Sequence, residues 1–184
     1  VEEKSLYLIE GNKQVKVYSV ATGKSGFPSP IGSWKVVSKG SWGGGFGERW
    51  LGLNVPWGKY GIHGTNRPGS IGSNASHGCI RMYNKDIREL YSLVTYGTKV
   101  IIVNGNFGPF GNGFKPINPG DRGADVYAVQ RRLKKLGFYR GYVDGIYGED
   151  MKTAVHSFQK CNGLPVENTV NRDDLLKLGF REFD

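Results

Sequence analysis

The spacing of apolar residues changes once along this chain, and the change limits the folds open to it. Up to about residue 104 the apolar residues alternate or form short runs, as in Gln14–Tyr18 and Lys99–Val103. From residue 119 onward they recur at helical intervals, as in Val126, Val129 and Leu133. A period of two is typical of strands, and a spacing of three to four residues is typical of helices. The sequence therefore predicts a mainly β unit followed by a small all-α unit.

The first predicted unit, residues 1–104, is rich in strands and glycine. A hairpin is expected over residues 5–20, and further strands are expected over 34–37 and 99–103. Glycine makes up 29 of the 184 residues, about twice its usual share, which favours strands and loops over a helical bundle. The glycine- and aromatic-rich stretch 40–60 suits a lid over a peptide, with some of its aromatic side chains lining a cleft.

One helix is predicted in this unit, over residues 84–94. Asn84 is its expected N-cap, and Gly97 is expected to end it. Four of its apolar residues share one helical face: Ile87, Leu90, Tyr91 and Val94.

The second predicted unit, residues 119–184, holds three short helices. The first has Leu136 on its apolar face and ends at Gly137, the second ends near Asn162-Gly163, and the third ends before Gly179. Residues 105–118 combine Gly, Pro and Asn without periodicity and are predicted to be a linker. Its three phenylalanines are more than a free tether would expose, so we expect partial docking of Phe107, Phe110 and Phe114.

Reactive side chains gather in the first unit. The segments Gly61-Ile62-His63-Gly64 and Ser76-His77-Gly78-Cys79-Ile80-Arg81 contain two of the three histidines and one of the two cysteines. A free thiol is mostly protonated at neutral pH, and a neighbouring imidazole can lower its pKa and accept its proton. Gly78 allows close approach of a substrate, so its N–H and that of Cys79 are candidate donors to an oxyanion. The pattern indicates a cysteine nucleophile with a histidine base.

Two other interpretations of these residues remain open. His63, His77 and Cys79 could bind zinc, although the recurring spacings of four-ligand structural sites are absent. Each of the three could instead be an ordinary buried side chain. Cys79 and Cys161 fall in different predicted units, so no disulfide is expected.

The motif also carries a family resemblance. Tyr60-Gly-Ile-His63-Gly-Thr-Asn and Ser76-His-Gly-Cys79-Ile-Arg-Met resemble the signature of the L,D-transpeptidase catalytic domain (YkuD-like). The resemblance implies a β-sandwich enzyme that cross-links bacterial peptidoglycan, and no cofactor or metal is expected. It implies that Cys79 attacks the carbonyl joining the third stem residue, a diamino acid, to the terminal D-Ala. An amine of a second stem then takes the acyl group, whereas water in its place would give an L,D-carboxypeptidase.

The same resemblance assigns roles to neighbouring residues. His63 matches the histidine taken as the base, with its ring oriented by the backbone carbonyl of Gly64. His77 is the rival base and is expected to be a buried supporting residue. Ser76 is expected to fix the loop by hydrogen bonds. No Asp or Glu lies between Glu48 and Asp86, so a carboxylate that orients His63 would have to come from elsewhere.

Four residues near the nucleophile are predicted to contact the substrate: Tyr60, Gly64, Ser76 and Arg81. The guanidinium fork of Arg81 suits a bidentate contact with a stem carboxylate. A structural ion pair explains this arginine equally well.

The second unit carries a resemblance of its own. Gly120-Asp-Arg-Gly123, Leu136-Gly-Phe-Tyr139, Val143–Gly148 and Ala154–Gln159 resemble the three-helix peptidoglycan-binding domain. Met151 stands where a helix-starting Thr is usual, and Asp150 is the alternative cap. Asn168 and Asn171 replace two turn glycines; Asn tolerates left-handed conformations, so the fold should survive, and carbohydrate affinity is the property affected.

The charge of the chain is compatible with peptidoglycan as its partner. A formal net charge of +9 favours anionic partners. The basic residues are scattered except for a cluster at 131–135 on a predicted helix face, so no nucleic acid is expected and a polyanionic cell wall fits better.

No run is long enough for a transmembrane segment and no signal pattern occurs, which is compatible with export. We expect a monomeric, extracytoplasmic protein of the cell wall or envelope; a non-catalytic wall-binding protein is the alternative.

Overall fold

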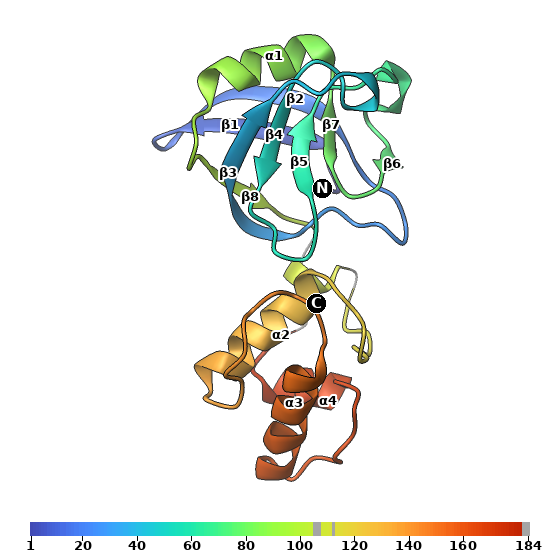
Figure 1. The fold of residues 1–184 in the computed structure, drawn as a ribbon, viewed down its shortest axis with the longest axis vertical. Coiled ribbons are helices and arrows are strands. Elements are labelled where there is room, and N and C mark those ends of the chain that lie inside the picture. The colour runs from blue at the N-terminus through green and yellow to red at the C-terminus, as the bar shows by residue number, and fades with distance from the viewer. Residues whose placement is uncertain (105–107, 112, 182–184) are drawn as a thin grey trace. The chain divides into compact units, whose positions relative to one another are not determined.

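The computed structural model of this chain describes residues 1–104, 108–111 and 113–181. The chain divides into two compact units, Val1–Val103 and Asn104–Asp184 (Figure 1). The predicted linker, residues 105–118, includes 105–107 and 112, so the expected docking of Phe107 lies outside the described residues.

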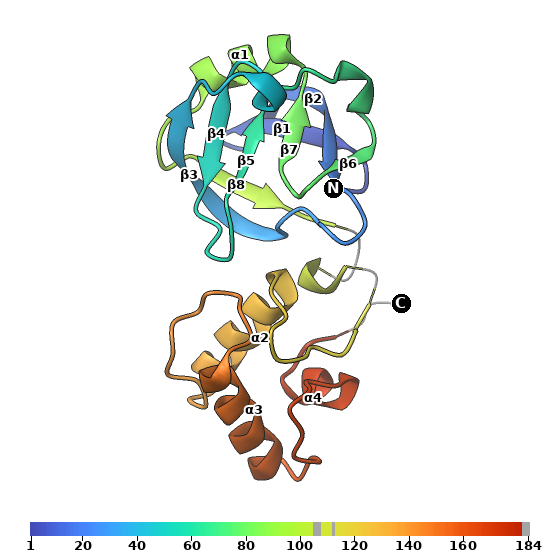
Figure 2. The same cartoon turned by 45° about the vertical axis from the view of Figure 1, so that its right-hand side comes forward.

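The first unit is built on a curled sheet. Its strands follow the order β1-β2-β7-β5-β4-β3-β8, with β6 beside β2. Figures 1 and 2 show β1 and β2 passing behind β4 and β5, so the sheet curls around its own core. The prediction of a mainly β unit with one α-helix is confirmed. The strands are β1 (Ser5–Glu10), β2 (Lys13–Gly23), β3 (Gly32–Gly40), β4 (Trp50–Leu53), β5 (Tyr60–His63), β6 (Asn74–Ser76), β7 (Ile80–Met82) and β8 (Lys99–Ile102).

The predicted strands are present, and the structure adds others. The hairpin expected over 5–20 is the antiparallel pair β1–β2, and the short strand expected over 34–37 extends over the whole of β3. Strands β4 and β5 were not predicted, because their stretch shows neither alternation nor β-branched runs. All four residues of β4 are buried, so no solvent-facing polar residues mark it as a strand.

The helix of the first unit, α1 (Asn84–Leu93), lies across one end of the sheet (Figure 2). Its predicted apolar face is confirmed, since Ile87, Leu90 and Val94 are buried. The predicted N-cap is wrong: Tyr83 occupies that position, and Asn84 Oδ1 accepts the backbone N–H of Thr65 at 3.1 Å. The predicted stop is wrong as well, because the helix ends at Leu93 and Gly97 belongs to the turn before β8.

The second unit has its own hydrophobic core around α2 (Ala124–Lys135), α3 (Glu149–Cys161) and α4 (Arg172–Lys177). The three predicted helices are therefore confirmed. Phe110 and Phe114 pack against this core as expected. Ile117 is 1% exposed and pairs with Val170, so packing of this unit begins before the predicted boundary at residue 119. Among the described residues, none of the helices combines the length and the apolar character that a membrane crossing requires.

Four details of the second unit differ from prediction. Leu136 is 42% exposed at the C-cap of α2 and does not join the core. Asp150 does not cap α3, whose N-cap is Gly148, and Met151 is fully buried. Neither turn asparagine is left-handed, since Lys4 is the only described non-glycine residue with positive φ. Asn171 instead caps α4 through a capping box with Asp174.

Candidate active site

The parallel pairing of β5 with β7 brings the reactive segments together. Ile62 lies opposite Ile80, and His63 lies opposite Arg81. Opposite residues of paired strands project to the same face, and residues two apart share that face. His63, Arg81 and the residue just before β7, Cys79, therefore lie on one face, while Ile62 and Ile80 are buried on the other.

The loop that carries the cysteine is fixed by Ser76. Its hydroxyl donates to the backbone carbonyl of Cys79 at 2.6 Å and accepts the N–H of Gly78 at 3.0 Å. Ser76 therefore holds the loop as predicted, but at 1% exposure it does not face a substrate. The predicted oxyanion role of the Gly78 N–H is wrong for this arrangement, because that N–H already donates to the Ser76 hydroxyl.

Gly78 has a steric reason to be glycine. Its φ of +108° is a conformation that side-chain-bearing residues rarely adopt. A Cβ at this position would also lie 2.6 Å from the ring of Tyr60. The half-buried ring of Tyr60 therefore packs against this loop, and its contact with substrate stays a prediction.

The thiol of Cys79 is half-buried and neutral in the resting site. Burial raises its pKa, and the backbone of Gly61 and the charge of Arg81 only partly offset that effect. Its Sγ has one long contact, to the carbonyl of Lys59 at 4.0 Å. A thiol of this kind needs a base to become a nucleophile.

His63 has the properties of such a base. It is 3% exposed, and its Nδ1 lies 2.5 Å from the carbonyl oxygen of Gly64, so the predicted orienting contact is present. A carbonyl only accepts hydrogen bonds, so we place the proton on Nδ1 and leave Nε2 as the acceptor of the neutral ring. Burial lowers the pKa of His63, and the nearby charge of Arg81 acts in the same direction.

An aromatic wall surrounds the His63 ring. Trp50 stacks on it with ring centroids 5.7 Å apart, and Phe46 meets it edge-on at 5.1 Å. Trp42 stacks in turn on Trp50 at 4.5 Å. Trp42 and Phe46 are 53% and 40% exposed, so they are the members of this wall that face solvent. Trp57 instead packs in the core against Trp34.

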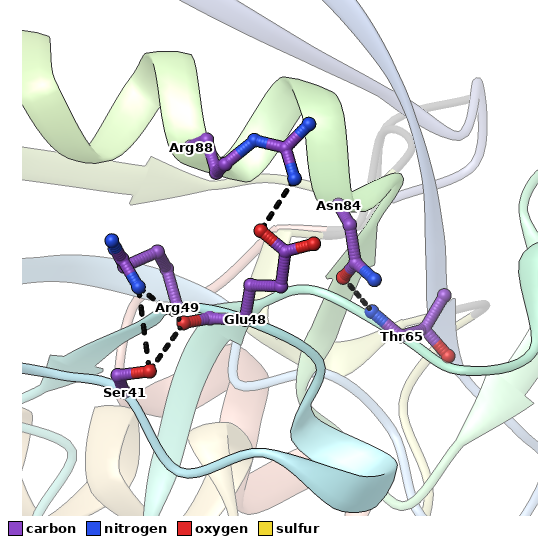
Figure 3. A network of polar contacts seen from close by, with 6 residues as sticks. All are labelled: Ser41, Glu48, Arg49, Thr65, Asn84 and Arg88. Atoms are coloured by element: carbon purple, nitrogen blue, oxygen red, sulfur yellow. Dashed lines mark hydrogen bonds and ion pairs between the residues drawn. The ribbon is translucent and has the colours of Figure 1, made fainter.

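The two loops that flank His63 are tied to the same helix (Figure 3). Glu48, at the end of the loop that carries Phe46, forms an ion pair with Arg88 of α1. Asn84 of α1 accepts the N–H of Thr65, two residues after His63. Ser41 closes the first loop by donating to the carbonyl of Glu48 at 2.7 Å. Helix α1 therefore fixes the walls around the histidine.

His77 lies apart from this arrangement. It is exposed, in the bend before Cys79, and its ring meets Phe27 edge-to-face at 4.9 Å. The expectation of a buried supporting residue is wrong. Among the residues that the structure describes, no group of three or more His, Cys, Asp or Glu side chains could hold a metal ion.

A pocket of about 400 Å³ adjoins His63, lined by Gly45, Thr65, Asn66, Arg67 and Arg81. Arg81 forms no ion pair with any described residue, so a structural ion pair does not explain it. Arg67 is a pocket residue that the sequence reasoning missed. Its signal was a basic residue within a stretch that lacks acidic partners.

The comparisons with known proteins agree with these motifs. Residues 1–102 match the model of the L,D-transpeptidase catalytic domain (YkuD), and residues 122–173 match the "Putative peptidoglycan binding domain". "Putative L,D-transpeptidase YkuD" of Bacillus subtilis is 46% identical over 100 residues, covering 54% of this chain and 60% of that protein. "Putative L,D-transpeptidase YqjB" of the same organism is 39% identical over 117 residues, covering 55% of this chain and 66% of that protein.

A solved structure is similar over the same share of the chain. The L,D-transpeptidase of Stackebrandtia nassauensis is 25% identical with a TM-score of 0.46, covering 54% of this chain and 50% of that one. This chain thus spans less than two thirds of the length of these relatives. The family model covers more than half of this chain and includes both reactive segments. The chain therefore belongs to the family of L,D-transpeptidase catalytic domains.

Proposed function

We propose that this protein is a cysteine-dependent L,D-transpeptidase that forms peptidoglycan cross-links. The observation that carries the proposal is the pairing of β5 with β7, which supports a site where the anchored His63 acts on the thiol of Cys79, the residue just before β7. A protonated thiol beside a neutral imidazole acceptor is the starting state for general-base activation of a nucleophile.

The acylation step follows from these protonation states. Nε2 of His63 takes the thiol proton as Cys79 Sγ attacks the carbonyl between the third stem residue and D-Ala. The positive charge of Arg81 stabilises the developing thiolate, since it lowers the pKa of Cys79. The tetrahedral oxyanion then collapses, and the C–N bond breaks. The D-Ala amine leaves with the proton from His63, and a thioester remains on Cys79.

The second half of the reaction reverses the proton path. The acceptor amine attacks the thioester carbonyl while His63 takes one of its protons. The C–S bond breaks, and the thiolate recovers that proton from the imidazolium. Of the two oxyanion donors considered, the N–H of Cys79 remains, because that of Gly78 is bonded to Ser76.

The second unit is proposed to hold the enzyme on its polymer. Residues 122–173 match a peptidoglycan-binding model, and this unit has a separate core. Peptidoglycan is then the partner of both units, which supports an extracytoplasmic location at the cell wall or envelope and a role in cell-wall organisation. We propose that the protein acts as a monomer, without a cofactor.

Incubation of the purified chain with disaccharide-tetrapeptide tests the proposal. A transpeptidase releases D-Ala and yields cross-linked dimers, which mass spectrometry distinguishes from the tripeptide made when water is the acceptor. Tripeptide alone would assign the L,D-carboxypeptidase reaction. Absence of D-Ala release with intact, folded protein would refute both reactions and leave a wall-binding protein.

A further inference from the structure

We propose that the pocket beside His63 is a carboxylate-binding subsite, with Arg67 and Arg81 as its two guanidinium groups. The inference rests on the proposed function and adds the charged group that the donor stem must present. Nothing in the catalytic steps above requires Arg67, so the subsite is a separate property of this chain.

Two residues that line the pocket are near His63 in the chain or in the sheet, although His63 and Cys79 do not line it themselves. Arg81 lies opposite His63 in the β5–β7 register, and Thr65 follows His63 by two residues. Gly45 closes the other side from the loop that carries Phe46. The volume of about 400 Å³ is in the range of small-ligand pockets. We therefore expect a group bound there to belong to the molecule whose carbonyl Cys79 attacks.

The charge of the pocket is uncompensated. Two of its five lining residues are arginines, none is acidic, and no Asp or Glu occurs in the sequence between Glu48 and Asp86. Neither Arg67 nor Arg81 forms an ion pair with a described residue. The Nε of Arg81 is buried and has no hydrogen-bond partner in the described part of the chain. Paired guanidinium groups that lack an acceptor suit a carboxylate, which they bind through parallel hydrogen bonds.

Hydrogen bonds hold the backbone around Arg67 before any ligand binds. The Thr65 hydroxyl accepts the N–H of Arg67 at 3.0 Å, and the N–H of Thr65 donates to Asn84 of α1 (Figure 3). Thr65 is 4% exposed, so both bonds are shielded from water. Only the Arg67 side chain has to be ordered when a ligand binds, which lowers the entropic cost of binding.

The donor stem offers two carboxylates near the attacked bond. One is the α-carboxylate of the terminal D-Ala, and the other is a side-chain carboxylate on the third residue, when its diamino acid has one. Both present the same chemistry to the arginines. Amidation of each in turn removes the charge and distinguishes the two sources.

The test measures binding to the 184-residue chain with Cys79→Ala, which cannot turn over its ligand. Isothermal titration uses three disaccharide-tetrapeptides: the free acid, the third-residue carboxamide and the D-Ala amide. We expect one amide to bind roughly 10- to 100-fold more weakly than the free acid, as loss of a charge-assisted contact does. Arg67→Gln in the same background should weaken free-acid binding about 10-fold and remove most of that difference. Lys13→Gln, which removes the same charge from an exposed hairpin site in the first unit, should leave binding unchanged.

The outcomes separate the subsite from the proposed reaction. Weaker binding of the D-Ala amide assigns the leaving-group carboxylate, and weaker binding of the other amide assigns the third residue. Equal affinities for all three ligands, an Arg67→Gln effect no larger than that of Lys13→Gln, or no binding at all would overturn the subsite. The proposed reaction is judged apart, by D-Ala release from the chain with Cys79 intact.

Discussion

Trp50 and His63 stack across the antiparallel pair β4–β5, with ring planes 25° apart and centroids 5.7 Å apart. Gly61 makes room for this contact, because a Cβ there would lie 2.6 Å from the indole. Together with Phe46, the indole keeps water from the imidazole, and desolvation is the largest cause of the lowered His63 pKa. The aromatic wall therefore helps to keep the imidazole of the proposed base neutral to lower pH.

Phe46→Ala should move the acid limb of the pH–activity profile to higher pH. The active form has neutral His63, so activity rises as pH rises through its pKa, which burial holds below the ordinary value of about 6.5. Removing the Phe46 ring admits water, raises that pKa and shifts the limb toward neutral pH. The measurement is kcat/KM for thiol acylation against pH, which reports the free enzyme. Phe27→Ala is the matched control, because Phe27 contacts His77; equal shifts in both variants would contradict the role of the wall.

His63→Ala should reduce the rate of Cys79 acylation by roughly 10²- to 10⁴-fold, the usual contribution of a general base. His77→Ala should retain most of the rate, and its free energy of unfolding should change by no more than about 0.5 kcal/mol because the side chain is exposed. Acylation by a carbapenem-type β-lactam gives the rate, and thermal unfolding gives the stability. A folded, unreactive His77→Ala beside a reactive His63→Ala would reverse the two roles.

Cys79→Ala should abolish D-Ala release and dimer formation, while its melting temperature stays near that of the wild type. The reason is that the polar contacts of Sγ are weak: the carbonyl of Lys59 lies 4.0 Å away, and the backbone of Gly61 only partly offsets the burial of the thiol. Cys161→Ser is the control: this second thiol is exposed on α3, and activity should be retained. Turnover by the Cys79→Ala protein would end the thiol mechanism.

Ser76→Ala should lower both stability and activity. It leaves the buried Gly78 N–H without an acceptor, at a cost of about 1–3 kcal/mol, and it frees the loop that positions Cys79. Ser73→Ala removes a hydroxyl that donates to the Ser70 carbonyl at an exposed site, and it should change neither property appreciably. Denaturant unfolding and D-Ala release measure the two effects; equal unfolding free energies for the two variants would contradict the loop-fixing role.

The fragment 104–184 should fold alone and sediment with insoluble peptidoglycan, because its core is built from its own residues. The shorter fragment 119–184 should melt at a lower temperature, since it lacks Ile117 and the phenylalanines that pack on this core. Co-sedimentation at low salt and thermal unfolding give the two measurements. A folded 104–184 fragment that stays in the supernatant would refute the binding role, and Asn168 and Asn171 would be the first residues to examine.

The sequence alone determined the two-unit organisation and the reactive segments. Local spacing is enough to predict the hairpin, helix α1 and the three C-terminal helices, because each buries residues at its own period. The combination of His63 and Cys79 with glycines likewise indicated a cysteine nucleophile with a histidine base, and the family resemblance implied acyl transfer.

Tertiary structure decided what those residues do. Strands β4 and β5 show no alternation, and the pairs Trp50–His63 and His63–Arg81 arise only when separate strands align. The same holds for the Asn84–Thr65 bond, which turns an expected helix cap into an anchor for the loop after His63. The pKa values of Cys79 and His63 depend on how much water packing excludes, and the exposure of His77 depends on the bend before Cys79. These are properties of contacts between distant segments, and local sequence does not encode them.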